Sequence, residues 1–419
     1  MGRNGERLLL FCGIVIALVF GWLLVEQSPS SQSRPSASST IETLVASQVS
    51  PGMTLFPSET EPEVYLFDIL GRVRYRWRFV PQKIFAKKYF LFPFEVFWAE
   101  PSQDGNLLVV FKDIGLSLVN PESEPIWSLR GRFHHDAERA PDGTVFALSR
   151  REVPVSLFGR ECLILSDFVS QISSDGKPVK ETNLFHSFAS FISEREYELA
   201  CAYSLEQKAS QRALLNDSPA DLLHVNSLSL LKFTTSVGAH EGDFLVSSRA
   251  RNAIALISRE TGGLVWLYHG DLDGQHDATQ IDPDTLLVFD NGTQRGNSRV
   301  LKISVAQKKI IWDFDLPFFE PFRSGVQQLP NGNLLVTSRE QGKLYEYSPA
   351  GQLVWEFENP APKGAKDKRI YRAVRIPVDS SFLALLKKTD SFQENSAVPF
   401  SSDPTVKKSR KPKKLSKTP

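Results

Sequence analysis

A short sequence frame recurs along this chain, and it restricts the fold more than any other feature. The triplet His135-Asp136-Ala137 returns as His276-Asp277-Ala278, and both copies precede a turn and an apolar run. Looser copies without histidine lie near residues 95–97, 325–327 and 372–374, and His224 begins the remaining copy. Equivalent positions of a closed repeat point toward a common axis. The frame therefore predicts that distant histidines form one site.

A second pattern alternates with the frame. It is an apolar strand that ends in Trp, and its copies contain Trp77, Trp127, Trp266, Trp312 and Trp355. A degenerate sixth copy near Asn183 lacks the Trp. Repeats of about 40–50 residues, with alternating strands between Gly, Pro, Asn and Asp turns, are typical of propeller blades. We therefore expect an all-β protein, a six-bladed β-propeller whose Trp residues pack between blades.

The N-terminal residues predict a membrane anchor. Residues 8–25 are almost wholly apolar, Arg3 and Arg7 precede them, and no basic residue follows before Arg34. Such a run is about long enough to cross a bilayer as one transmembrane helix. The positive-inside bias then places the N-terminus in the cytoplasm and the propeller on the periplasmic or extracytoplasmic side. A cleaved signal peptide is the alternative, although no clear cleavage site follows the run.

Composition divides the rest of the chain. We expect an anchor over residues 1–27, a Ser/Pro-rich tether over 28–59, the propeller over 60–390 and a disordered basic tail over 391–419. One insertion departs from the repeat, and a helix is expected within residues 188–215. Cys162 and Cys201 could form a disulfide in an exported chain. The formal net charge of +1 does not call for a nucleic acid partner.

Four polar residues of the inner frame suit transfer of an oxyanion: His135, His224, Arg249 and His276. Arg offers a fixed fork of donors to sulfate or phosphate. A neutral imidazole is a competent nucleophile, and neighbouring imidazoles can donate hydrogen bonds or protons. No Gly-rich phosphate loop is present for a nucleotide donor, and no cofactor is expected.

Several segments, in order, resemble the arylsulfate sulfotransferase family. They are Asp221-Leu222-Leu223-His224-Val225-Asn226-Ser227, Val246-Ser247-Ser248-Arg249, Gly274-Gln275-His276-Asp277-Ala278 and Phe289-Asp290-Asn291-Gly292. The resemblance runs from about residue 134 to residue 357. It implies a six-bladed propeller that moves a sulfuryl group from a small aryl sulfate donor to a phenolic acceptor, without a nucleotide.

The resemblance also implies roles for the residues. His276 would carry the transient sulfate as a sulfohistidine, Arg249 would hold the sulfuryl oxygens, and His135 and His224 would assist. Asn226, Gln275 and Asn291, which belong to the same segments, would bind substrate. His134 stands beside His135, and the repeat frame selects His135. Well-studied secreted members carry a separate N-terminal β-sandwich, and in its place we expect only the anchor and the tether here.

Two other functions compete with sulfuryl transfer. Three histidines around one axis could bind zinc for metal-dependent chemistry, although the positive charge of Arg249 opposes a dication. The chain could instead be a membrane-anchored propeller that acts as a binding scaffold without catalysis. The oligomeric state and the natural acceptor do not follow from the sequence.

Overall fold

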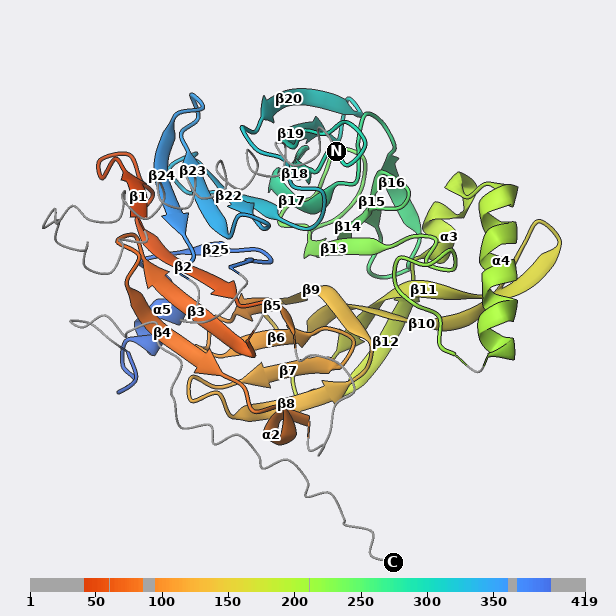
Figure 1. Ribbon diagram of the computed structural model, residues 1–419, viewed down its shortest axis with the longest axis horizontal. Coiled ribbons are helices and arrows are strands. Elements are labelled where there is room, and N and C mark those ends of the chain that lie inside the picture. The colour runs from red at the N-terminus through yellow and green to blue at the C-terminus, as the bar shows by residue number, and fades with distance from the viewer. Residues whose placement is uncertain (1–40, 60, 86–94, 211, 361–367, 393–419) are drawn as a thin grey trace, which may run out of the picture. The chain divides into compact units, whose positions relative to one another are not determined.

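Six antiparallel sheets surround a central axis in this protein (Figure 1). The structure is a computed structural model, and it describes residues 41–59, 61–85, 95–210, 212–360 and 368–392. The six sheets are the blades of a β-propeller that carries one helical insertion, which confirms the predicted fold of this part of the chain. We number the blades in chain order and give their strands from the axis outward.

Blade 1 contains β25 (Val374–Pro377), β2 (Gly52–Pro57), β3 (Glu63–Asp68) and β4 (Val73–Arg78). Blade 2 contains β5 (Val96–Pro101), β6 (Leu107–Phe111), β7 (Gly115–Val119) and β8 (Pro125–Arg130). Blade 3 contains β9 (Phe133–Arg139), β10 (Val145–Leu157), β11 (Arg160–Ile172) and β12 (Pro178–Asn183).

Blade 4 contains β13 (Val225–Leu230), β14 (Phe244–Ser248), β15 (Ala253–Ile257) and β16 (Leu264–Tyr268). Blade 5 contains β17 (His276–Asp282), β18 (Thr285–Asp290), β19 (Arg299–Ser304) and β20 (Lys309–Asp315). Blade 6 contains β21 (Gly325–Gln328), β22 (Leu334–Ser338), β23 (Lys343–Tyr347) and β24 (Leu353–Glu358), with β1 (Ile41–Leu44) at its outer edge.

The ring closes where blades 6 and 1 meet. Each of these two blades combines strands from near the beginning of the chain with strands from near its end. β25 pairs with β2, so that Leu55 opposes Val374, and β1 pairs with β24, so that Leu44 opposes Trp355. Residues 41–57 were expected within the tether, and the expected propeller boundary at residue 60 is therefore two strands too late. The Ser- and Pro-rich composition ends near residue 40, and the mostly buried side chains of 52–57 belong to a blade.

Apolar layers between neighbouring blades hold the ring together. Each of the six blade interfaces contains a cluster of buried hydrophobic side chains, drawn from the facing sheets. The Trp residues of the repeat belong to these interfaces, as predicted. The indole N–H groups of three of them donate across the interfaces, from Trp127 to Ser174, from Trp266 to Val305 and from Trp355 to Ile69.

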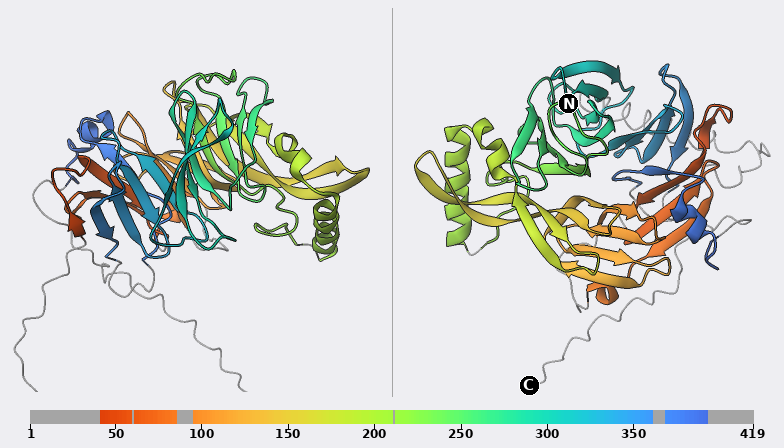
Figure 2. Two further views of the ribbon diagram at one scale, coloured as in Figure 1. Left: turned by 90° about the horizontal axis from the view of Figure 1, so that it is seen from above. Right: turned by 180° about the vertical axis from the view of Figure 1, so that it is seen from behind.

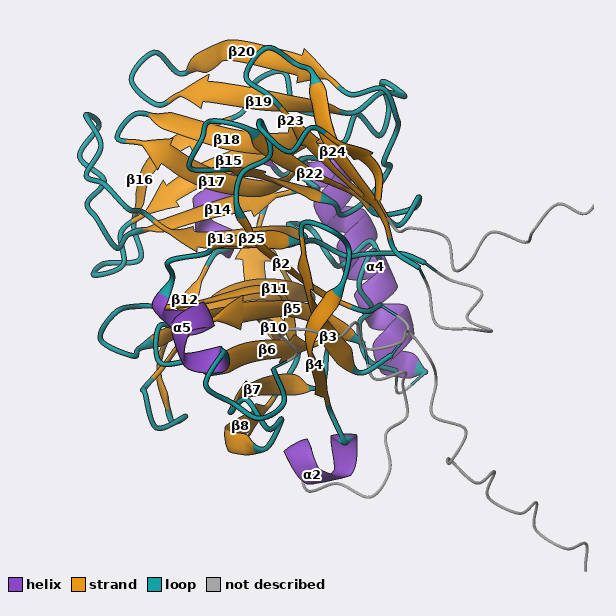
Figure 3. Cartoon of the chain, turned by 90° about the vertical axis from the view of Figure 1, so that its left-hand side faces the viewer, coloured by secondary structure: helices purple, strands orange, loops and turns teal. Residues whose placement is uncertain are grey.

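The insertion builds an arm on blade 3. β10 and β11 pair along thirteen residues each and extend beyond the ring, and α4 (Glu194–Ala209) packs against them (Figure 2). A capping box of Ser193 and Glu196 begins α4, the longest helix of the described chain (Figure 3). Helix α4 confirms the expected helix within 188–215. A disulfide joins Cys162 of β11 to Cys201 of α4, with the Cα atoms 5.2 Å apart.

The remaining helices are short. They are α2 (Pro81–Phe85), α3 (Phe185–Phe188), α5 (Ser381–Leu386) and the 3-10 turn η1 (Ala189–Phe191). No helix of the described residues is long and apolar enough to span a bilayer. The apolar run at 8–25 and the basic tail lie outside the described residues.

Candidate active site

The inner strands of four blades are irregular where they begin, and the candidate site lies at this end. The ladders shift register near Phe97 in β5, His135 in β9, Asn226 in β13 and Asp277 in β17. Such bulges redirect side chains and commonly occur beside active sites. His135, His224 and Asp277 have φ angles of 52°, 46° and 52°, which non-glycine residues rarely adopt.

His276 is held by hydrogen bonds on both sides of its ring. Its Nδ1 atom lies 2.7 Å from Asn291 Oδ1 and 3.0 Å from the carbonyl of Gly274. The Asn291 amide nitrogen donates to the carbonyls of Glu320 and Arg323, so its oxygen must face the ring. Two acceptors at Nδ1 place the ring proton there. Nε2 then keeps its lone pair, and the backbone N–H of Arg323 lies 3.3 Å from it.

The His276 ring is neutral at physiological pH. Burial lowers its pKa from 6.5 to about 3, and the positive charge of Arg249 acts in the same direction. Gly274 has a φ of 71°, and a Cβ atom there would meet Thr293 Oγ1 at 2.5 Å. This glycine therefore allows the backbone turn that brings its carbonyl to His276.

His224 and Arg249 are linked through acidic partners. The Nδ1 atom of His224 lies 2.8 Å from Asp221 Oδ2, and Asp217 Oδ1 accepts from Arg249 Nη1 at 2.8 Å. The backbone N–H of Arg249 also donates to the carbonyl of His224. Although burial opposes ionisation of Asp221, the charge and hydrogen bond of His224 lower the pKa of Asp221 to about 2. An ionised carboxylate beside the ring stabilises positive charge on it.

His135, rather than His134, faces the cavity, as the repeat frame predicts. Its ring centroid lies 5.4 Å from that of His224 and 5.3 Å from that of Phe97. Burial, and then the charges of His134 and His224, hold the pKa of His135 well below its ordinary range. His134 lies behind it, with a Nδ1 to Nδ1 distance of 2.8 Å.

A cavity of about 730 Å³ brings the predicted residues together. His135, His224, Arg249 and His276 all line it, although they come from three blades. Its other lining residues are Phe97, Lys112, Phe322, Arg323, Arg339 and Arg369, together with Asn216, Asp217 and Glu340, so that basic side chains outnumber acidic ones. The guanidinium of Arg249 lies 4.8 Å from the centre of the Phe322 ring. Such walls suit an aromatic anion.

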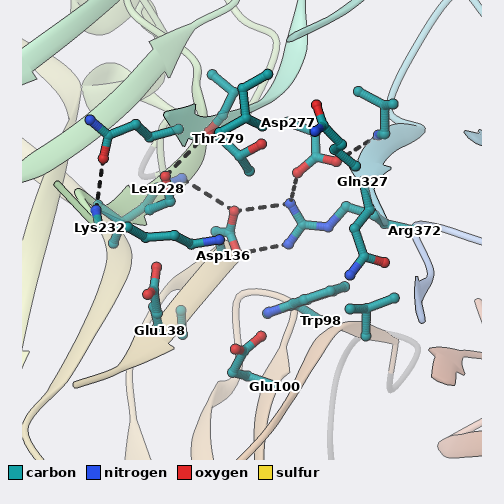
Figure 4. A pocket seen from close by; sticks show the side chains of 18 of the residues that line it. Trp98, Glu100, Asp136, Glu138, Leu228, Lys232, Asp277, Thr279, Gln327 and Arg372 are labelled. Atoms are coloured by element: carbon teal, nitrogen blue, oxygen red, sulfur yellow. Dashed lines mark hydrogen bonds and ion pairs between the residues drawn. The ribbon is translucent and has the colours of Figure 1, made fainter. Parts of the chain in front are cut away.

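A buried ion-pair triad lies beside this cavity and not in its lining. Arg372 donates to Asp136 at 2.8 Å and to Asp277 at 2.5 Å, and its guanidinium lies over Trp98 (Figure 4). Asp136 follows His135, and Asp277 follows His276. The triad thus joins the strands that carry two of the three histidines. Beyond it, Glu100, Glu138 and Lys232 help to line a separate cavity on the axis.

Three predicted substrate-binding residues lie behind the cavity rather than in its wall. Asn226, Gln275 and Asn291 are at most 2 % exposed. Asn226 donates to the carbonyl of Gln275, and Gln275 donates to Ser247 Oγ and to the carbonyl of Ser248. Their hydrogen bonds fix the backbone around His224 and His276, and that of Asn291 fixes the imidazole itself.

The geometry of the histidines does not favour one shared metal ion. Among the described residues, one group brings three possible ligand atoms within 4.8 Å of one another, and it consists of Asp217, Asp221 and His224. His135 and His276 are not part of it. Asp217 already holds Arg249, whose charge opposes a cation at this place.

Sequence reasoning missed several residues in and around the cavity. Asp221 stands three residues before His224, and this spacing was a usable signal for their pairing. Phe97 and Arg372 stood in loose copies of the frame, but the frame without histidine suggested no role for them. Arg323 precedes the copy that begins blade 6, and no signal in the sequence separates it from other arginines.

Several solved structures are similar to this chain in fold. A protein of unknown function from Bacteroides caccae has a similar fold, with 13 % identity, a TM-score of 0.51 and coverage of 78 % of this chain and 99 % of that one. A streptogramin B lyase structure is 12 % identical, with a TM-score of 0.43 and coverage of 76 % and 86 %. The Dos1 propeller is 8 % identical, with a TM-score of 0.42 and coverage of 74 % of each chain.

No curated protein matches the chain in sequence. Residues 103–360, more than half of the chain, match the sequence profile of one family. These residues include all four polar side chains predicted for the site. The chain therefore belongs to the arylsulfotransferase (ASST) family.

Proposed function

We propose that this protein transfers a sulfuryl group from an aryl sulfate to a phenol, with His276 as the nucleophile. One observation carries the proposal. His276 is neutral and buried, its Nδ1 proton is committed to Asn291 and Gly274, and it lines a cationic, aromatic cavity. A fixed neutral imidazole with its lone pair on Nε2 is the state that a nucleophile requires, and the backbone N–H of Arg323, at 3.3 Å, makes only a long hydrogen bond to that lone pair.

The surrounding residues suit the charges of this reaction. The guanidinium of Arg249 can hold sulfuryl oxygens in the donor, the intermediate and the product. His224 is backed by the carboxylate of Asp221, and it can donate a proton to the departing phenolate. The ring of Phe322, under Arg249, offers a surface for the aryl group.

The transfer takes place in two steps that use the same atom. The lone pair of His276 Nε2 forms a bond to sulfur while the bond between sulfur and the aryl oxygen breaks. The phenolate leaves with that electron pair and takes a proton from His224. The acceptor oxygen then bonds to sulfur, the sulfur–nitrogen bond breaks, and its electron pair returns to Nε2. No nucleotide or cofactor takes part.

The test separates the donor step from the transfer step. Wild-type protein mixed with a nitrophenyl sulfate should release a burst of nitrophenol before any acceptor is added. Mass spectrometry should then show an added sulfuryl group on the peptide that contains His276. His276→Ala should abolish both, whereas His240→Ala, at an exposed histidine, should change neither. A His276→Ala variant that retained turnover would refute the assignment.

We also propose that residues 8–25 anchor the propeller outside the cytoplasm. The support is the apolar run that follows Arg3 and Arg7. Reporter fusions after Ser39 should be active on the extracytoplasmic side, and the protein should remain with membranes. A soluble form that has lost its N-terminal residues would contradict the anchor.

A further inference from the structure

Asp167, His134 and His135 form a buried row of polar side chains inside blade 3, and the row ends at His135. His134 and Asp167 are each 1 % exposed, and neither lines the cavity. His134 Nε2 lies 3.2 Å from Asp167 Oδ1, and His134 Nδ1 lies 2.8 Å from His135 Nδ1. The first contact is not a straight hydrogen bond, but Nε2 has no other polar partner among the described residues.

The carboxylate of Asp167 determines which nitrogen of His134, and then of His135, carries the ring proton. An ionised carboxylate only accepts hydrogen bonds, and Oδ2 already accepts the backbone N–H of Val225 at 2.9 Å. Oδ1 therefore calls for a proton on His134 Nε2. In a neutral ring the other nitrogen, Nδ1, then carries a lone pair. That lone pair accepts the Nδ1 proton of His135, so Nε2 of His135 has no proton.

We propose that Asp167 and His134 are positioning residues that keep the His135 proton on Nδ1, so that Nε2 accepts the proton of the phenolic acceptor. The inference rests on the proposed sulfuryl transfer and deepens it. It assigns different tasks to the two assisting histidines. His224 donates to the leaving phenolate, and His135 removes the proton of the incoming phenol.

The proton balance of the second step follows from this assignment. The phenol oxygen bonds to sulfur while its proton moves to His135 Nε2, and the sulfur–nitrogen electron pair returns to His276. His135 then carries one extra proton. The 5.4 Å contact between the rings of His135 and His224 lets that proton return, directly or through solvent, to the residue that donated one in the first step.

One nearly isosteric substitution should exchange the hydrogen-bond donors and acceptors along this row. In Asp167→Asn, the amide oxygen can still accept from Val225 N, which turns the amide NH₂ toward His134. That group donates to Nε2, so the His134 proton moves to Nδ1 and points at His135. His135 must then carry its own proton on Nε2, where it cannot accept another. An aspartate-to-asparagine change that imposes the wrong tautomer is a known way to disable a catalytic imidazole.

The experiment measures each half-reaction of the full-length protein. Asp167→Asn should keep the nitrophenol burst in size and rate, because His224, and not His135, donates the proton to the leaving nitrophenolate. Transfer to a phenol that is un-ionised at the assay pH should fall about 10²- to 10⁴-fold in kcat. Transfer to a halogenated phenol that is already ionised should fall far less. Asp243→Asn, at another buried carboxylate that accepts backbone N–H groups, is the matched control.

A second substitution distinguishes a change in the position of the His135 proton from general damage to the site. His134→Asn places an amide oxygen near the position of Nδ1, and it can accept from His135 whatever occupies position 167. The double variant His134→Asn/Asp167→Asn should therefore transfer to the un-ionised phenol at least tenfold faster than Asp167→Asn alone. If the double variant is slower, or if Asp167→Asn transfers normally, the inference is wrong. Absence of a burst in the wild-type protein would instead refute the proposed function.

Discussion

Acidification should destabilise this protein through His276, the proposed nucleophile. Burial holds the pKa of His276 at about 3 in the folded chain, against 6.5 when exposed. Between these values the unfolded chain binds a proton that the folded chain excludes, so the free energy of unfolding falls as pH decreases. The full difference is ~5 kcal/mol below pH 3, and ~2 kcal/mol of it should be lost between pH 7 and pH 5.

Urea unfolding of the wild type and of His276→Gln, followed by Trp fluorescence at pH 7 and pH 5, isolates this effect. Glutamine does not titrate, whereas the other buried groups titrate in both proteins. The free energy of unfolding should therefore decrease by ~2 kcal/mol more in the wild type than in the variant. Equal decreases in the two proteins would show that the folded site tolerates an imidazolium at His276, and the neutral nucleophile would have to be abandoned.

Three other sets of substitutions address the arm, the buried ion-pair triad and the contact of Arg249 with the sulfuryl oxygens. Replacing Cys162 and Cys201 by Ser should lower the free energy of unfolding by up to ~4 kcal/mol, given their separation of 39 residues, and leave the burst intact; equal urea midpoints would disprove it. Arg372→Met should cost ~3–5 kcal/mol by leaving two buried carboxylates without a cation, and denaturation at pH 7 measures it. Arg249→Lys keeps the charge but loses the fork, so burst kcat/KM should fall ~10- to 100-fold, and an unchanged value would contradict its role.

The repeat in the sequence predicted the ring and the position of the histidines in it. Each frame marks the beginning of an inner strand, and inner strands meet at the axis. This relation requires no side-chain detail, which is why residues as distant as His135 and His276 could be assigned to one cavity. The Trp pattern succeeded for a similar reason, because an outer strand packs against the next blade in every repeat.

The repeat did not predict the directions in which individual side chains point. Asn226, Gln275 and Asn291 were expected to bind substrate because they belong to the segments that resemble the family, but local bulges disturb the alternation of side chains along the strands that begin at the histidines. Neighbours in sequence therefore need not face the same cavity. Asp167 lies on the third strand outward of blade 3, and no local spacing connects it to His134. The start of the propeller was missed because neither β1 nor β2 carries the histidine frame or the Trp pattern from which the blades were recognised.

The arginine that ties β9 to β17 comes late in the chain. Arg372 lies just before β25, the strand that closes the ring against β2. A chain shortened before this point would contain all three histidines but would leave Asp136 and Asp277 without their shared cation. It would also leave β2 with an open edge. Closure of the ring and completion of the candidate active site are therefore one event. We expect a partly folded chain to have no activity.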